Sequence, residues 1–107
     1  MKDVIHPGQF LVEHMQRFNI DIKEICKRAG IHPTYLERLI KKKARIGVPA
    51  NLKLGKLFGN SEFFWALAQA AWDKKEALKS DRLREKIGSM ESLKETGDKK
   101  PPESPLP

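Results

Sequence analysis

Apolar residues recur at the three- and four-residue spacing of short amphipathic helices, and no segment alternates as a half-buried strand does. The first such stripe predicts a helix that opens near Pro7, where the fixed φ of proline suits the first turn, and that ends at Asn19-Ile20. Its predicted inner face consists of Phe10, Leu11, His14, Met15 and Phe18.

Two shorter stripes follow. The second predicted helix covers Ile22–Ala29, with Asp21 as N-cap and Gly30 as left-handed C-cap. The third covers Pro33–Ile40, with His32 as N-cap. The apolar residues expected to face inward from these two helices are Ile22, Ile25, Cys26, Ala29, Leu36, Leu39 and Ile40.

A fourth helix is expected from Pro49 to Phe58, and a fifth, capped by Ser61, runs to about Lys79. Asp81–Lys94 keeps a weak helical spacing among many charges, and the last residues hold four prolines with little to bury. We therefore expect an all-α fold with a five-helix domain at 1–80, an amphipathic helical extension at 81–94 and a disordered tail at 95–107.

Charge narrows the choice of partner. The chain has 107 residues and a formal net charge of +7, of which residues 21–47 supply +5. A polyanionic partner is expected to bind this basic block, although a basic surface that binds only water would have the same net charge. One cysteine excludes a disulfide scaffold, and no apolar run is long enough to span a membrane. We expect a soluble cytoplasmic protein.

The basic block coincides with the second and third predicted helices, whose short glycine-containing connection has the proportions of a helix-turn-helix. The start of the later helix can enter a major groove, where an arginine reads guanine bidentately and lysines neutralise phosphates. An ordinary helical hairpin is the alternative. The predicted DNA-binding residues are Lys23, Lys27, His32, Thr34, Tyr35, Arg38, Lys41, Lys42, Lys43 and Arg45.

Catalysis is not expected, because no nucleophile–base set, phosphate loop or zinc-ligand spacing can be assembled, and no cofactor or metal is expected. His6 is interpreted as a capping or packing residue, His14 as a core-edge histidine and Cys26 as a buried spacer. The aromatic stripe of the fifth helix is interpreted as core or dimer interface rather than as a base-stacking platform. The predicted interface residues are Phe64, Trp65, Ala68 and Trp72.

Three motifs within about residues 5–79 resemble a known family. His6-Pro7-Gly8, the stretch Leu52–Ser61 and the pattern Phe64-Trp65…Gln69…Trp72-Asp73 are similar to the corresponding motifs of HigA-type (VapI-like) antitoxins with a Cro/CI-like (lambda repressor-like, XRE family) helix-turn-helix. The resemblance implies a homodimer that binds an inverted-repeat operator in double-stranded DNA and represses its own operon. It also implies a cognate toxin partner of the RelE/HigB type, a basic mRNA endonuclease.

The chain departs from the family pattern in three places. Ile22 replaces a frequent phosphate-contacting glutamine, Cys26 replaces a small alanine, and Lys41–Arg45 replaces Asn-Gly-Lys-Arg. We expect loss of that glycine to change the loop and the added lysines to strengthen non-specific DNA binding. Two alternatives stay open: a stand-alone Cro/CI-like repressor without a toxin, and a protein-interaction module that no longer binds DNA. Asp81–Lys94 is a candidate contact for the dimer or the toxin.

Overall fold

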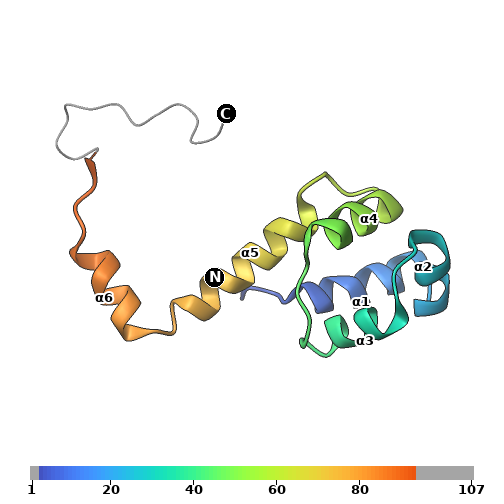
Figure 1. Cartoon of the computed structure of the whole chain (residues 1–107), viewed down its shortest axis with the longest axis horizontal. Coiled ribbons are helices and arrows are strands. Elements are labelled where there is room, and N and C mark those ends of the chain that lie inside the picture. The colour runs from blue at the N-terminus through green and yellow to red at the C-terminus, as the bar shows by residue number, and fades with distance from the viewer. Residues whose placement is uncertain (1–2, 94–107) are drawn as a thin grey trace. The chain divides into compact units, whose positions relative to one another are not determined.

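The computed structural model describes residues 3–93, which contain six α-helices and no strand (Figure 1). The predicted all-α fold is confirmed for this part of the chain. The helices are α1 (Pro7–Phe18), α2 (Ile22–Ala29), α3 (Pro33–Ile40), α4 (Val48–Phe58), α5 (Phe64–Ala77) and α6 (Asp81–Ser89).

Contacts divide the chain into one unit over Met1–Glu76 and a second over Ala77–Pro107. The first unit holds α1 to α4 and nearly all of α5, and it carries every predicted DNA-binding residue. The second unit holds α6. The sequence placed the boundary after Ser80, three residues beyond the end of α5. The predicted tail at 95–107 lies outside the described residues.

Local sequence explains where the first three helices begin and end. The Nδ1 atoms of His6 and His32 accept hydrogen bonds from the backbone N–H groups of Gly8 and Thr34, so both histidines cap helices that proline opens. A left-handed residue, Asn19, follows α1 at φ 51°. These boundaries confirm the predictions for all three helices.

The other predicted boundaries need correction. The fourth helix begins at Val48 rather than Pro49, with Gly47 as N-cap. Ser61 does not cap the fifth helix directly, because its carbonyl accepts the Phe64 N–H across an intervening turn, and the helix starts at Phe64. α5 also ends at Ala77, before the predicted Lys79. Within the described part of the predicted extension, the α-helix covers Asp81–Ser89.

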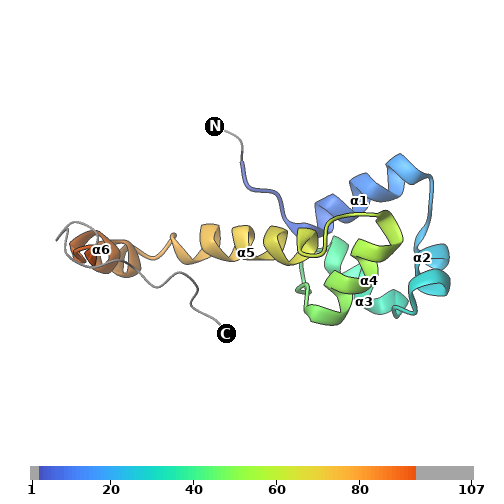
Figure 2. The same ribbon diagram turned by 90° about the horizontal axis from the view of Figure 1, so that it is seen from above.

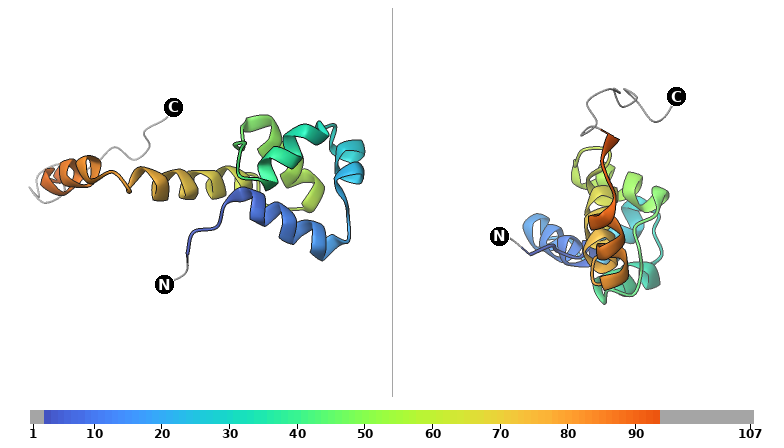
Figure 3. Two further views of the ribbon diagram at one scale, coloured as in Figure 1. Left: turned by 90° about the horizontal axis from the view of Figure 1, so that it is seen from below. Right: turned by 90° about the vertical axis from the view of Figure 1, so that its left-hand side faces the viewer.

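The core of the first unit draws on all five of its helices. Figures 2 and 3 show α1 along one side of this unit, with α2 at the C-terminal end of α1. Helices α1 and α3 approach closely, because Gly8 leaves room where any Cβ would overlap the Leu39 carbonyl oxygen. The fully buried apolar side chains are Leu11, Ile25, Leu36, Leu39, Leu54 and Trp65.

Buried polar side chains fix how α5 sits against the rest of this unit. The Asn51 amide donates to the Glu62 carbonyl at 2.7 Å and accepts from the Ala66 N–H at 2.9 Å, which joins α4 to the start of α5. The Gln69 carbonyl oxygen accepts from the Ile46 N–H at 2.9 Å, which joins α5 to the loop before α4. Each bond satisfies a buried group, so the register between these elements is specified.

Candidate nucleic-acid interface

α2 and α3 form a compact helix pair with a short turn. Gly30 ends α2 at φ 66°, a conformation that glycine adopts without strain, and Ile31 is buried beneath the turn. The Lys53 ammonium, on α4, donates to the Gly30 carbonyl at 3.2 Å and braces this turn from outside the pair. The sequence prediction missed Lys53, since only the tertiary fold brings it to residue 30.

The solvent-facing side of α3 presents a single stripe of side chains. Thr34, Glu37, Arg38 and Lys41 follow one another at helical spacing, and all four are exposed. We call this set the α3 stripe. It includes three of the residues predicted to bind DNA and one, Glu37, that the prediction left out. An exposed stripe of this kind, on the later helix of a pair, can reach base edges in a major groove.

Arg38 is held by the loop that follows α3. Its Nη2 donates to the Lys43 carbonyl at 2.8 Å, while the Lys43 N–H donates to the Arg38 carbonyl at 2.8 Å. The guanidinium therefore closes the helix end onto the loop. It keeps further N–H donors for a ligand, but its direction is set before any ligand arrives.

Tyr35 does not belong to the α3 stripe. Its side chain is half-buried, and its hydroxyl donates to the Arg45 carbonyl. Burial raises the pKa of the phenol above its ordinary 10.0. The structure thus places Tyr35 as a support for the loop after α3, whereas the sequence predicted it as a DNA-binding residue.

The loop after α3 carries the densest positive charge. Lys41, Lys42 and Lys43 are all exposed, and Lys42 adopts a left-handed conformation at φ 64°. A lysine thus takes a left-handed conformation that glycine would adopt without strain, at a cost of about 1 kcal/mol or more for a side chain with a Cβ. The Lys42 ammonium also lies 5.7 Å from the centre of the Trp72 ring.

Arg45 is tied to α5. Its guanidinium makes a bidentate pair with Asp73 at 2.9 and 2.7 Å, and Gln69 donates to the same carboxylate at 2.9 Å. The hydrogen bond raises the pKa of Arg45, and the bonds from Arg45 and Gln69 lower the pKa of Asp73. Asp73 neutralises much of the charge that the sequence assigned to DNA binding at Arg45.

The remaining predicted DNA-binding residues lie on or before the turn. Lys23 and Lys27 are exposed on α2, and His32 is exposed at the start of α3. The His32 ring caps the helix through Nδ1, which confirms the predicted N-cap. Its position beside Thr34 leaves the ring at the end of the helix that carries positive partial charge.

The predicted interface residues on α5 have unequal exposure. Trp65 is fully buried in its own chain, where its indole N–H donates to Asn60 at 2.9 Å, so it has no surface to offer a second copy. Phe64 and Ala68 are half-buried. Trp72 is also half-buried and packs edge-on against His6, with ring centres 5.0 Å apart.

Exposed apolar area lies instead beside these residues. Four side chains on α4 and at the start of α5 are between 55% and 71% exposed, and the Asn51 bonds hold the two helices together next to them. We call this set the apolar patch: Val48, Leu52, Phe63 and Leu67.

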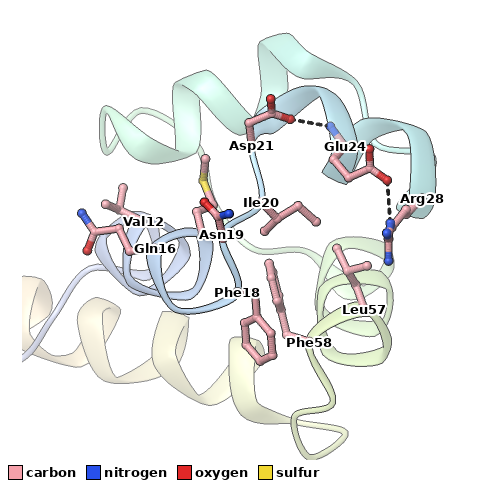
Figure 4. Close-up of a pocket in the computed structure, with 11 residues that line it drawn as sticks. Val12, Gln16, Phe18, Asn19, Ile20, Asp21, Glu24, Arg28, Leu57 and Phe58 are labelled. Atoms are coloured by element: carbon pink, nitrogen blue, oxygen red, sulfur yellow. Dashed lines mark hydrogen bonds and ion pairs between the residues drawn. The ribbon is translucent and has the colours of Figure 1, made fainter.

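A recess of about 780 Å³ opens where α1 and α4 end and α2 begins (Figure 4). Its apolar lining includes Phe18 and Phe58, whose ring centres lie 5.5 Å apart, and Phe18 is half exposed at the rim. Asp21 and Glu24 also line it, and Glu24 pairs with Arg28 at 2.6 Å. Arg28 lines the recess as well, so its rim combines apolar surface with two carboxylates and one guanidinium, unlike the basic loop after α3.

Residues 3–93 contain neither a metal-binding cluster nor a membrane-spanning helix. No group of three or more histidine, cysteine or acidic side chains is placed to hold a metal ion within these residues. No helix among them is both long and apolar enough to cross a membrane.

The chain is similar to known regulators. It is 31% identical over 81 residues to YddM, an HTH-type transcriptional regulator of Escherichia coli K12, covering 73% of this chain and 86% of YddM. It is 27% identical over 90 residues to YbaQ, another HTH-type regulator of the same strain, covering 83% of this chain and 80% of YbaQ. No family model matches the chain.

Solved structures share the fold. An addiction module antidote protein of the HigA family from Coxiella burnetii is 27% identical and aligns with a TM-score of 0.73, over 85% of this chain and 98% of its own. The Pseudomonas aeruginosa antitoxin HigA, solved with the higBA promoter, aligns with a TM-score of 0.72 at 21% identity, over 85% of this chain and 99% of its own.

Proposed function

Because the chain belongs to the family of HTH-type transcriptional regulators and has the fold of HigA-type antitoxins, we propose that it is a DNA-binding antitoxin that represses its own operon. The observation that carries this proposal is the α3 stripe, which stands exposed beside a loop of three exposed lysines. The stripe reads the operator in the major groove, and the lysines contact phosphates. The Pseudomonas aeruginosa antitoxin HigA, which shares this fold and was solved with the higBA promoter, supports DNA binding by the fold.

The first test is an operator shift assay on DNA from upstream of the gene. Replacing Lys41, Lys42 and Lys43 by Ala removes up to three phosphate contacts, so the slope of log affinity against log salt becomes shallower by about 0.9 per lost contact. The matched control replaces Lys56, Lys74 and Lys86 by Ala, which removes the same charge elsewhere. Equal losses in both triple variants would show that only net charge matters and would refute the proposed DNA-binding surface.

We propose that the operator-binding form is a homodimer that buries the apolar patch, with Phe64 and Ala68 at its margin. Large apolar side chains that stand exposed next to one another are typical of a protein–protein interface. A two-fold symmetric homodimer would place its two α3 helices about one DNA turn apart. Leu67→Glu is expected to give a monomer in sedimentation, with DNA affinity reduced at least about 100-fold. A Leu67→Glu chain that still sediments as a dimer would place the interface elsewhere.

We further propose that the partner is a RelE/HigB-like toxin, as the resemblance implies. The similarity to an addiction module antidote protein of Coxiella burnetii supports an antidote role in general. The recess is the surface to test first, because its half-exposed Phe18 offers apolar area and the carboxylate of Asp21, which forms no salt bridge within residues 3–93, can pair with a basic partner. α6 is the second candidate.

Co-expression with any short reading frame that adjoins the gene tests this part. Neutralisation of a growth-arresting product by the wild type, and its loss with Phe18→Glu but not Leu67→Glu, would support the recess. Truncation after Lys79 tests α6 separately. If the product of the neighbouring frame does not arrest growth, with or without any variant of this chain, the toxin assignment is contradicted.

A stand-alone repressor without a toxin is the second candidate function. The relatives YddM and YbaQ, which are described only as HTH-type transcriptional regulators, favour it. The two candidates share the operator assay and differ in the co-expression assay. If the chain binds its operator and the neighbouring reading frame encodes no growth-arresting product, the chain is a stand-alone repressor.

A further inference from the structure

An acidic residue stands in the most basic part of the surface. Glu37 is the only acidic residue between Pro33 and Gly47, a segment with five basic residues. It lies on the α3 stripe, three residues after Thr34 and four before Lys41, and its side chain is exposed. A surface that only attracted phosphates would gain from any neutral or basic side chain at this position.

The Glu37 carboxylate is not used inside the part of the chain that the structure describes. Three other acidic groups of the first unit have clear roles there: Asp21 caps α2, Glu24 pairs with Arg28, and Asp73 holds Arg45. Within residues 3–93 no such hydrogen bond or ion pair involves the Glu37 side chain. The neighbouring guanidinium of Arg38 is directed to the Lys43 carbonyl instead.

Docking α3 in a major groove would bring this carboxylate between two rows of phosphates. Repulsion and loss of hydration then oppose binding unless the oxygens accept hydrogen bonds from the DNA. The donors in the major groove are the N4 amine of cytosine and the N6 amine of adenine. Adenine places its N7 acceptor beside the amine, where it repels a carboxylate, whereas cytosine presents only a C–H there.

We propose that Glu37 is a specificity-determining residue that accepts a hydrogen bond from the N4 amine of an operator cytosine. This inference rests on the proposed DNA-binding function and adds to it the base that one named side chain reads. Thr34 and Lys41 flank the contact on the same face. Glu37 thus weakens binding to DNA in general and favours DNA with cytosine at one position of each half-site.

The test is selection from a pool of randomised DNA duplexes by the full chain and by Glu37→Ala and Glu37→Gln variants. The wild type is expected to select half-sites with one invariant C·G pair. Glu37→Ala keeps the other selected positions but loses at least about 10-fold of the discrimination at that pair. Glu37→Gln moves the preference to adenine, since an amide can donate to N7 while accepting from N6.

Glu13→Ala is the matched control, because it removes another exposed carboxylate, on α1, and leaves α3 unchanged. It is expected to select the wild-type site. A Glu37→Ala chain that binds more tightly with unchanged base preference would show a solvated charge and overturn this inference alone. A wild-type chain that selects no sequence, although it unfolds cooperatively, would overturn the proposed function and this inference with it.

Discussion

The chain contains the same helix start twice, with different outcomes. His6-Pro7 and His32-Pro33 each open a helix, and in each pair Nδ1 of histidine accepts the N–H two residues later, at 2.9 and 3.1 Å. His6 is only 3% exposed and packs against Trp72, whereas His32 is exposed at the edge of the α3 stripe. Local sequence determines that each histidine caps its helix. The tertiary surroundings decide whether the histidine ring is buried in the core or stays exposed to a ligand.

The largest expected difference concerns the residue after each proline. Gly8→Ala places a Cβ against the Leu39 carbonyl, with its carbon only 2.8 Å away, and backbone on both sides must shift. We expect a loss of about 3 kcal/mol or more in the free energy of unfolding. Thr34→Ala, at the matching exposed position, is expected to change it by less than about 0.5 kcal/mol. Urea unfolding measures both, and similar values would refute the close approach of α1 and α3.

The two capping histidines themselves should differ next. His6→Ala removes a cap and a buried ring, so we expect a loss of about 2 kcal/mol or more. His32→Ala removes only the cap and should cost about 1 kcal/mol. Thermal unfolding followed by circular dichroism compares them. A larger loss at His32 would mean that α3 depends on its cap more than α1 depends on burial.

Acid should affect the buried cap. Burial, and then the nearby positive charge of Lys42, lower the pKa of His6 below its ordinary 6.5, while Asp73 opposes the shift. The unfolded chain then binds the proton more readily, so stability present above about pH 6.5 is lost as pH falls through the folded pKa. Protonated Nδ1 also cannot accept the Gly8 N–H.

This dependence is measured as the melting temperature between pH 7.5 and 5. His6→Asn, which keeps a capping oxygen, should flatten the profile. Asp73, whose lowered pKa lies below its ordinary 3.8, contributes only at more acidic pH. An unchanged profile in His6→Asn would assign the pH dependence to other groups.

The smallest expected effect concerns Lys42, which lies near the buried capping residue His6 and not near the exposed one, His32. Lys42→Gly relieves the left-handed strain at φ 64° and removes a charge that disfavours protonated His6. We expect a gain of about 0.5 kcal/mol at neutral pH, a weaker pH dependence and a shallower salt slope for DNA. Lys43→Gly, one residue on, is the control and should not stabilise the chain.

The first three helices were predictable because their signals are local. Proline after histidine, Asp21 before α2 and Gly30 after it act within one turn of the chain, and the structure has all of them. The start of α5 was not predictable, because Ser61 has the right side chain for a cap but lies in a turn that leads to Phe64. The Asn51 bonds to Glu62 and Ala66, from another helix, hold this start in place.

The candidate site was predictable in place but not in detail. The basic block and the helix pair identified the surface, since charge and periodicity are read directly from residues 21–47. The bonds from Arg38, Tyr35 and Arg45 to the loop or to α5 were not predictable, because each partner is set by how the loop folds back. The role proposed for Glu37 was not predictable either, because it depends on the bonds that its neighbours Arg38 and Tyr35 make to the loop.

The sequence by itself determined the helical fold, the caps of α1 to α3 and the face that carries the charge, because these depend on neighbours within a few residues. The tertiary structure alone decided that His6 is buried while His32 is exposed, that Trp65 belongs to the core, and which side chains of α3 are free for a ligand. Burial and long-range hydrogen bonds join residues far apart in the chain, and no local pattern records them.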